Sequence, residues 1–395
     1  MLAILFLNFA ILFFAINLLI FAGQSVKNII HPKKNNLQRI HNVSLQKVYP
    51  GYSQQKIDDL LAEIWSRELE FEEFTQFKER ATQGKYVNVS SSGYRLTVPQ
   101  GPWPPDSTAY NIFLFGGSTT FGYGVADGDT IATFLQKDLK TAFRGKNIWV
   151  YNFGRGFYYS SQESILFQRL LVNGYKPNMA IFIDGLNEFL KGPGDEPVNT
   201  DDLHNHMEVQ ATNTNTPLTI AASRFIDNLP MMRFVQYIKA YGAKPWDRLP
   251  PLTSKQVVTN KYNNKDELLT MIQRYFANKK VTEGVSEIYH IPAIFVLQPV
   301  PFYKYDLSYN LFYKGFSDPR LTSNCENSCY SLYGYPLLAS KLKDTDQSDL
   351  IWLGDMQEGE HKPLYVDPFH YTADMHGQIA ARLMAFIQEH RFLPQ

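Results

Sequence analysis

Beyond residue 105, short apolar runs alternate with amphipathic stretches along the chain. The apolar runs cover residues 112–115, 148–153, 179–184 and 293–298, with a weaker one at 350–353. Runs of this length, bounded by glycine, asparagine or serine, are typical of buried strands, and amphipathic stretches between them are typical of crossover helices. The pattern therefore predicts an α/β domain over residues 106–395, built on a parallel sheet.

Helices are predicted between these strands and at the end of the chain. They cover residues 130–143, 161–173, 266–289 and about 374–390, and a capping-box pattern, Ser160-Ser161-Gln162-Glu163, introduces the second. Two insertions, at about 190–285 and 301–360, interrupt the pattern. The first contains a polar loop over 190–217 and a helical stretch over 225–241, and the second is irregular and rich in aromatic residues. Insertions after parallel strands often border the functional site, so we expect both to do so.

The segment before this domain, residues 24–105, is polar and mixed in composition. A helical pattern runs over residues 55–80, and turn-rich sequence follows it up to Pro104 and Pro105. We interpret the segment as a stem, or N-terminal extension, that packs on the domain that follows.

Residues 2–22 are almost entirely apolar and carry no charged side chain. A helix of about 20 such residues is long enough to span the hydrocarbon core of a bilayer. The run therefore predicts a single-pass transmembrane anchor over residues 1–23, and a signal peptide cleaved near Ala22 is the alternative.

Two features bear in opposite directions on the side of the membrane that the main domain occupies. Four basic residues follow the apolar run, which by the positive-inside rule indicates the cytoplasm: Lys27, Lys33, Lys34 and Arg39. Cys325 and Cys329, the only cysteines, stand four apart in a polar loop and could close a small disulfide ring after export. We expect an extracytoplasmic domain, periplasmic or at the cell surface, with the state of the cysteines open.

Charge and cysteine content exclude several classes of protein. The 38 basic and 38 acidic residues balance, whereas a nucleic-acid-binding protein usually concentrates a basic excess, so no nucleic-acid partner is expected. Two cysteines cannot build a disulfide scaffold or a four-cysteine zinc site. His204 and His206, with Asp201 and Asp202 nearby, are a candidate metal cluster, but a solvated loop is the better interpretation because no partner stands at ligand spacing.

Glycine-rich and polar motifs follow three of the predicted strands, and a fourth motif precedes the last helix. They read Gly116-Gly117-Ser118, Gly154-Arg155-Gly156, Gly185-Leu186-Asn187-Glu188 and Asp367-Pro368-Phe369-His370. The carboxyl ends of neighbouring parallel strands meet at one edge of a sheet, so the first three motifs are expected to lie close together.

The residue types in these motifs fit acyl transfer. Ser118 would be the nucleophile, on a tight strand-to-helix turn that the small glycines allow. A serine hydroxyl needs a base within hydrogen-bond reach, and His370 can take its proton. Asp367, three residues earlier, can accept the other imidazole N–H and fix the tautomer.

The tetrahedral intermediate of acyl transfer carries an oxyanion that needs hydrogen-bond donors aimed at it. The Ser118 backbone N–H, the Asn187 amide and a glycine N–H from residues 154–156 could supply three. Arg155 stands between the two glycines, where it either binds an anionic group of the substrate or pairs with a local acid.

In this order, the four motifs resemble the blocks of the SGNH (GDSL-like) hydrolase superfamily. Gly117-Ser118 resembles the nucleophile block, Asn187 the asparagine of the third block, and Asp367-x-x-His370 the terminal block. The resemblance covers about residues 111–190 and 292–390. It implies a flavodoxin-like three-layer α/β/α sandwich and an esterase, lipase, thioesterase, carbohydrate deacetylase or glycan acyltransferase that requires no cofactor or metal.

The sequence departs from the usual blocks at three places. Gly117 stands where an aspartate is usual, and Glu188 also replaces an aspartate. The second block reads Asn152-x-Gly154-x-Gly156, whereas common members have Asn-x-Gly-x-x-Gly. From the resemblance we expect Gly156 to be the oxyanion glycine, with Gly154 as the alternative.

Together the motifs and the resemblance predict a membrane-anchored serine hydrolase that cleaves acyl esters through an acyl-enzyme. The expected substrate is an acyl ester, with O-acetyl groups on a cell-surface glycan as the specific candidate. An acyltransferase that modifies an extracellular polysaccharide would differ only in its acceptor. A non-catalytic glycan-binding domain would require a defective set of groups, and each expected group is present. Oligomeric state is not determined by the sequence.

Overall fold

The computed structural model describes residues 12, 13, 17, 44–190, 192–193, 261–313, 329–343 and 348–393. The chain divides into two compact units, Met1–Asn36 with Asp201–Val257, and Leu37–Thr200 with Val258–Gln395. Nearly all of the first unit lies outside the described residues, including most of the predicted anchor. The helix predicted over 225–241 and the candidate metal cluster at His204 and His206 also lie outside them. In the described part of the chain, no helix is both long enough and apolar enough to cross a membrane.

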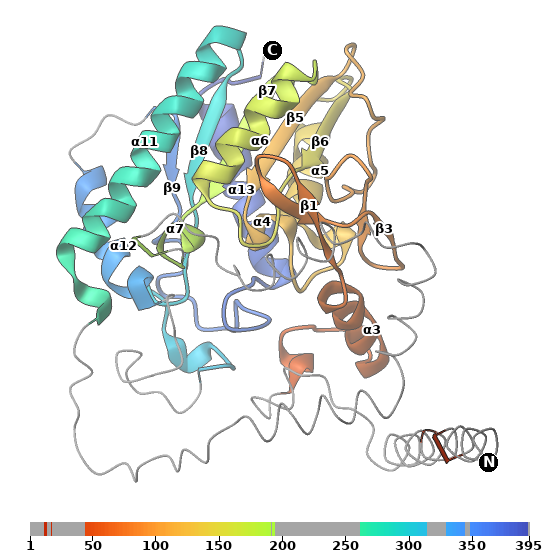
Figure 1. Cartoon of the computed structure of the whole chain (residues 1–395), viewed down its shortest axis with the longest axis vertical. Helices are drawn as coiled ribbons and strands as arrows, with labels where there is room; N and C mark the ends of the chain where they lie inside the picture. The colour runs from red at the N-terminus through yellow and green to blue at the C-terminus, as the bar shows by residue number, and fades with distance from the viewer. Residues whose placement is uncertain are drawn as a thin grey trace, which may run out of the picture. The chain divides into compact units, whose positions relative to one another are not determined.

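Five parallel strands form the central sheet of the second unit (Figure 1). They are β5 (Tyr110–Gly116), β6 (Ile148–Asn152), β7 (Met179–Asp184), β8 (Ala293–Leu297) and β9 (Leu350–Trp352). Their spatial order is β6-β5-β7-β8-β9, and each adjacent pair is parallel. All five predicted strands are confirmed, and the order is the one that flavodoxin-like sheets adopt.

The direction in which strands are added reverses between β5 and β7, because β6 lies beyond β5 and β8 lies beyond β7. In open α/β sheets, ligands bind outside the carboxyl ends of the strands at such a switch point. Two short helices begin there, α4 (Ser118–Phe121) after β5 and α7 (Leu186–Leu190) after β7. The topology therefore brings the first and third motifs together.

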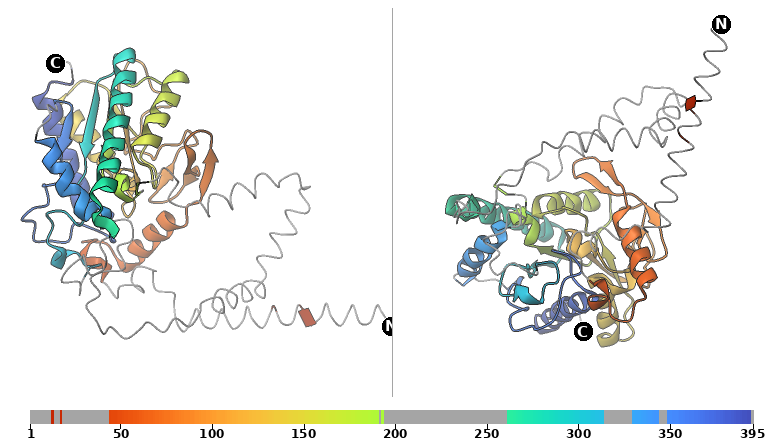
Figure 2. Two further views of the ribbon diagram at one scale, coloured as in Figure 1. Left: turned by 60° about the vertical axis from the view of Figure 1, so that its left-hand side comes forward. Right: turned by 90° about the horizontal axis from the view of Figure 1, so that it is seen from below.

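Helices cover both faces of the sheet, which gives three layers (Figures 1 and 2). On one face, α5 (Ile131–Ala142) packs against α13 (Ala373–Glu389), and on the other α6 (Ser160–Val172) packs against α11 (Lys265–Tyr289). These four helices confirm the predicted ones to within a residue or two at each end.

Alternate residues of β5 face the two helical layers. Ile112 and Leu114 belong to the aliphatic core that the sheet forms with α5 and α13. Phe113 and Phe115 point the other way, where Phe115 stacks on Phe182 of β7 with ring centroids 4.8 Å apart. Both faces of the strand are buried, which explains why its sequence is a continuous apolar run rather than an alternating one.

Side-chain caps begin some of these helices but not the one for which a capping box was predicted. Thr372 Oγ1 accepts the Met375 N–H at 3.3 Å at the start of α13. At α6 the capping-box prediction is wrong, because the helix begins at Ser160 itself and the Ser160 N–H donates to Glu188 Oε1 at 2.6 Å. The Glu163 side chain is buried in the interior instead of reaching back to the helix start. The Glu188 carboxylate of α7 thus accepts an N–H at the start of α6, where a capping side chain of the same segment was expected.

The described part of the N-terminal extension is only partly helical. It contains α3 (Gln54–Trp65), the hairpin β1 (Leu69–Glu72)–β2 (Gln76–Glu79), the pair β3 (Thr82–Gln83)–β4 (Asn88–Val89) and the 3-10 helix η1 (Leu45–Lys47). The helix predicted over 55–80 is therefore wrong beyond Trp65. Apolar and charged residues alternate in β1, which favours a strand, and the positive φ angles of Phe74 and Gln76 form the hairpin turn.

The extension shares a hydrophobic core with the elements around the nucleophile motif. Leu60 and Ile64 of α3 and Val89 of β4 are buried in one cluster with Phe121 of α4 and Val366. The predicted packing of the extension on the following domain is thus seen for its described residues, and Figure 1 shows α3 near the end of the sheet where α4 and α7 begin.

The second insertion, predicted to be irregular, contains a helix, α12 (Cys329–Leu342). The helix was not predicted because Gly334 and Pro336 both disfavour helix interiors. A Cβ at Gly334 would overlap the ring of Phe189 in α7, so glycine allows the two helices to pack closely. Cys329 is disulfide-bonded, and Cys325, the chain's other cysteine, lies outside the described residues. Three further 3-10 helices are η2 (Asp127–Asp129), η3 (Lys261–Asn263) and η4 (Leu307–Tyr309).

Candidate active site

Ser118, His370 and Asp367 form a continuous hydrogen-bonded chain at the carboxyl end of the sheet. Ser118 Oγ lies 2.9 Å from His370 Nε2, and His370 Nδ1 lies 2.6 Å from Asp367 Oδ2. The other oxygen of Asp367 accepts the backbone N–H groups of Phe369 and His370, at 2.8 and 2.7 Å, which fixes the carboxylate. His370 and Asp367 are buried, whereas Ser118 is partly exposed and is the member of the chain that a ligand can reach.

The turn that carries Ser118 leaves little space for a side chain at either of its two glycines. A Cβ at Gly116, where φ is 155°, would overlap the side chain of Thr120, and a Cβ at Gly117 would overlap the amide of Asn187. At residue 117, where the usual block has an aspartate, any side chain would therefore require the Asn187 amide to move. Ser118 is the first residue of α4, so its N–H has no acceptor within the helix.

Asn187 lies in α7 and is buried beside the nucleophile turn. Its Nδ2 atom donates to the carbonyl oxygen of Tyr158 at 2.6 Å, which orients the amide. An amide nitrogen has two hydrogens, so one remains for another acceptor. The structure thus brings the predicted asparagine next to the residue that precedes Ser118.

The N–H groups of the two glycines in the second block are already engaged. The Gly156 N–H donates to Glu79 Oε1 at 2.6 Å, and the Gly154 N–H donates to Asn152 Oδ1 at 3.0 Å. Neither group is free to donate to an oxyanion, so the expected donor role of Gly156, and the alternative at Gly154, do not fit the structure. The carboxylate that accepts the Gly156 N–H belongs to β2 of the extension, so the residues of the second block alone do not indicate it.

Arg155 is buried and does not line an open crevice. Its guanidinium forms an ion pair with Glu72 of β1 and donates to the Tyr158 hydroxyl at 2.8 Å. Of the two roles considered from the sequence, pairing with an acid is the one observed, and the acid comes from the extension. The proposed contact with an anionic substrate group is not supported.

Two aromatic residues flank the histidine, and the sequence contains no motif that marks either of them. The Tyr123 ring stacks on the His370 ring, with centroids 5.2 Å apart and an interplanar angle of 20°. The Trp65 ring meets both edge-on, with centroids 5.4 Å from Tyr123 and 5.9 Å from His370. Burial, and then the nearby Glu79 carboxylate, raise the pKa of Tyr123 to about 12, so its hydroxyl stays protonated at neutral pH.

A buried arginine of the extension holds the loop that follows α4. Arg95 is fully buried, and its Nε donates to Asp127 Oδ1 at 2.8 Å. The other guanidinium nitrogens donate to the backbone carbonyls of Phe121, Gly122 and Val125 at 2.6–3.0 Å. The Arg95 side chain therefore binds the backbone carbonyl groups at the end of α4, which is three residues after Ser118, and in the turn that follows.

Three buried carboxyl groups lie behind Asn187. Burial and then their mutual charge raise the pKa of Glu163, of α6, and of Asp184, at the end of β7, well above the ordinary range. Glu188 lies next to Asn187 in the chain and accepts the N–H of Ser160. The cluster joins α6, β7 and α7.

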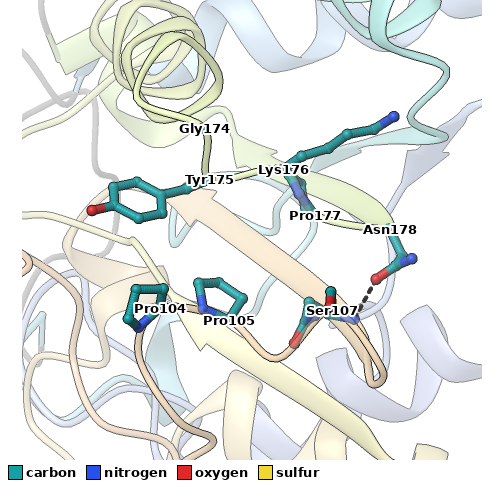
Figure 3. Close-up of a pocket in the computed structure, with 9 residues that line it drawn as sticks. Pro104, Pro105, Ser107, Gly174, Tyr175, Lys176, Pro177 and Asn178 are labelled. Atoms are coloured by element: carbon teal, nitrogen blue, oxygen red, sulfur yellow. Dashed lines mark hydrogen bonds between the residues drawn. The ribbon is translucent and has the colours of Figure 1, made fainter.

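The cavity drawn in Figure 3 lies at the opposite end of the sheet. It has a volume of about 460 Å³ and is lined by Pro104, Pro105, Ser107, Asn111, Gly174, Tyr175, Lys176, Pro177 and Asn178. Asn111 is at the amino end of β5, and its N–H donates to Asn178 Oδ1 just before β7 at 2.8 Å. No predicted catalytic residue borders this cavity, so we do not assign it to the reaction.

Comparison with known proteins gives one family. A family model described as GDSL-like Lipase/Acylhydrolase matches residues 112–383, which is more than half of the chain. No curated protein matches the chain.

Several solved structures are similar at low identity. An acetyl xylan esterase shares 12% identity with a TM-score of 0.33, over 70% of this chain and 98% of that one. A psychrotrophic esterase from Pseudoalteromonas sp. shares 9% with a TM-score of 0.32, over 71% and 97%. A lipase from a goat rumen metagenome shares 10% with a TM-score of 0.40, over 70% and 97%.

Proposed function

The chain belongs to the GDSL-like lipase/acylhydrolase family and is a serine esterase, and on this basis we propose that Ser118, His370 and Asp367 hydrolyse an acyl ester. The observation that carries the proposal is the hydrogen-bonded chain from Ser118 Oγ to His370 and on to Asp367, with separations of 2.9 and 2.6 Å. A serine hydroxyl becomes a nucleophile at neutral pH only with a base within such reach.

The reaction proceeds in two halves. Ser118 Oγ attacks the ester carbonyl carbon while its proton passes to His370 Nε2, and Asp367 accepts the Nδ1–H and stabilises the imidazolium. The tetrahedral intermediate then collapses, His370 returns the proton to the leaving alcohol, and the acyl group remains on Ser118. Water, deprotonated in turn by His370, attacks this acyl-enzyme and releases the acid.

For the oxyanion we propose three donors: the Ser118 N–H, the Asn187 amide and the Phe157 N–H. Phe157 stands five residues after Asn152, where the Asn-x-Gly-x-x-Gly pattern has its second glycine. Its φ of 63° lies in the left-handed region that glycine favours, which fits a position where related chains carry glycine. In the described part of the chain its N–H makes no hydrogen bond, in contrast to the N–H of Gly156.

For the substrate we propose acetyl esters of a cell-surface glycan. The apolar run at residues 2–22 supports a single-pass anchor with an extracytoplasmic catalytic domain, which would hold the enzyme beside such polymers. Carbohydrate deacetylation is among the activities that the resemblance implies. Transfer of the acyl group to a polysaccharide hydroxyl is the second candidate, because it uses the same acyl-enzyme and changes only the acceptor.

The serine mechanism is tested by acetate release from p-nitrophenyl acetate, with the full chain compared with Ser118→Ala. We expect the substitution to lower kcat by about 10⁴-fold or more, because the covalent step is lost. Equal rates in the two proteins would contradict the proposed mechanism and favour a non-catalytic, glycan-binding role.

Hydrolase and transferase are distinguished with the same enzyme and an added oligosaccharide acceptor. A hydrolase releases acetate at the same rate with and without the acceptor, and the mass of the oligosaccharide does not change. A gain of one acetyl group by the oligosaccharide would identify the transferase.

A further inference from the structure

We propose that Trp65 of the N-terminal extension binds the alcohol part of the ester and that this part is a carbohydrate ring. The proposal rests on the serine mechanism above. It identifies a residue that selects the substrate by contact with its alcohol part. Trp65 lies outside the region matched by the family, 112–383, so this contact is an addition that the extension makes to the site.

The position of Trp65 is unusual for a large apolar side chain. It is the last residue of α3 and is 49% exposed, although its ring lies against the buried His370 and against Tyr123. A tryptophan that only completed the core would be covered, because an indole buries a large apolar area at a favourable free energy. About half of this residue is therefore open to a ligand, and its ring lies beside the imidazole.

The chemistry of the reaction identifies which part of the ester lies against the Trp65 ring. The carbonyl oxygen must face the donors on α4 and α7, where the Ser118 N–H and Asn187 lie. The leaving oxygen must face His370 Nε2, since that atom returns the proton to it. The alcohol therefore projects past the imidazole, toward the ring that flanks it, and the acyl group does not.

The exposed aromatic surface favours a sugar over a small aliphatic alcohol. A sugar ring presents a flat set of C–H groups to an aromatic face and hydroxyl groups at its rim. Trp65, at 49% exposure, supplies such a face beside His370, and the hydroxyl groups of a sugar packed on it would stay in contact with solvent. Glu79 is not part of this surface, because it is buried and accepts the Gly156 N–H.

The test uses two esters with a single acetyl group that differ only in their alcohol, methyl 6-O-acetyl-glucopyranoside and ethyl acetate. Acetate release is measured for the full chain, Trp65→Ala, Trp65→Phe and a control, Phe74→Ala. Phe74 is an exposed aromatic residue of the same extension, at the hairpin turn, where it contacts Arg169 of α6.

We expect Trp65→Ala to lower kcat/KM for the glucoside by about 10- to 100-fold more than for ethyl acetate, the range found when a well-placed tryptophan is truncated. Trp65→Phe should recover most of the difference, since it keeps an aromatic face, and Phe74→Ala should change neither ester. An equal loss on both esters would overturn the proposal and leave Trp65 as a packing partner of His370. No loss on either ester would also overturn it.

A binding measurement separates this proposal from the serine mechanism. In the Ser118→Ala background turnover is expected to be about 10⁴-fold slower, so the dissociation constant of the glucoside can be measured by calorimetry with and without Trp65→Ala. Weaker binding by at least about 10-fold supports the contact even if the esterase assay fails. Unchanged binding contradicts it even if the esterase assay succeeds.

Discussion

Gly117 and Asn187 constrain each other at the nucleophile turn. The Asn187 amide occupies the space that a side chain at residue 117 would fill, and its bond to the Tyr158 carbonyl holds it there. The glycine before the serine is therefore part of the way in which this chain places the amide that we propose as an oxyanion donor.

We predict that Gly117→Ala lowers kcat by about 10²–10³-fold with a smaller change in KM, because the displaced amide no longer stabilises the oxyanion. Asn187→Ala should cause a similar loss. If the two substitutions act through the same donor, the double variant is no slower than either single one, which steady-state kinetics of the three proteins would show. Additive losses would mean that residue 117 acts in another way.

Among the elements, the extension has the largest effect on the site. The β1–β2 hairpin supplies Glu72 to Arg155 and Glu79 to the Gly156 N–H, and α3 ends with Trp65 beside His370. Arg95, further along the extension, fixes the loop after α4. These contacts hold the second block and the nucleophile turn in place, which makes the extension a structural part of the active site.

We predict that Arg95→Met lowers the free energy of unfolding by about 3–5 kcal/mol, because Asp127 and three carbonyl groups lose a buried partner. Urea denaturation of the full chain measures this change. The control is Arg80→Met, since Arg80 and its partner Glu68 form an exposed ion pair whose loss should cost about 0–1 kcal/mol. Equal changes for the two variants would contradict the role assigned to Arg95.

At the scale of the whole molecule, the buried carboxyl groups make stability depend on pH. Glu163 ionises near its ordinary pKa of 4.5 in the unfolded chain but at a higher pH when folded, because burial and then the charge of Asp184 disfavour its charged form. Below the unfolded pKa the group does not penalise folding. As pH rises above that value the unfolded state loses protons first, so stability falls until the folded group also ionises.

We predict that Glu163→Gln raises the midpoint of thermal unfolding at pH 8 by about 2–4 °C, the shift that ~1 kcal/mol produces in a domain of this size. At pH 4, where the glutamate is mostly neutral in both states, the two proteins should unfold at similar temperatures. Glu389→Gln, at an exposed position in α13, is the control and should change neither midpoint. A gain that is equal at both pH values would exclude the titration of Glu163 as its cause.

Much of the architecture could be predicted from the sequence because it depends on local pattern. The apolar runs correspond to the five strands, and Ser118, Asn187, Asp367 and His370 come together as their places after strands and before α13 implied. Two predictions were wrong for different reasons. Gly334 and Pro336 disfavour a helix locally, but α12 forms because it packs against other elements. After Trp65 the chain forms a strand where a helix was predicted.

The sequence by itself determined the order of the strands and the three residues that form the Ser118–His370–Asp367 hydrogen-bonded chain. Both depend on short local segments, and a parallel sheet brings the carboxyl ends of its strands together. The tertiary structure decided which N–H groups remain free, which acid pairs with Arg155 and which ring flanks His370. Each of these depends on a partner distant in the sequence: Glu79 is 77 residues from Gly156 and Glu72 is 83 residues from Arg155. Buried polar groups are nearly always hydrogen-bonded, so the role of a glycine N–H or an arginine depends on which partner the fold brings to it.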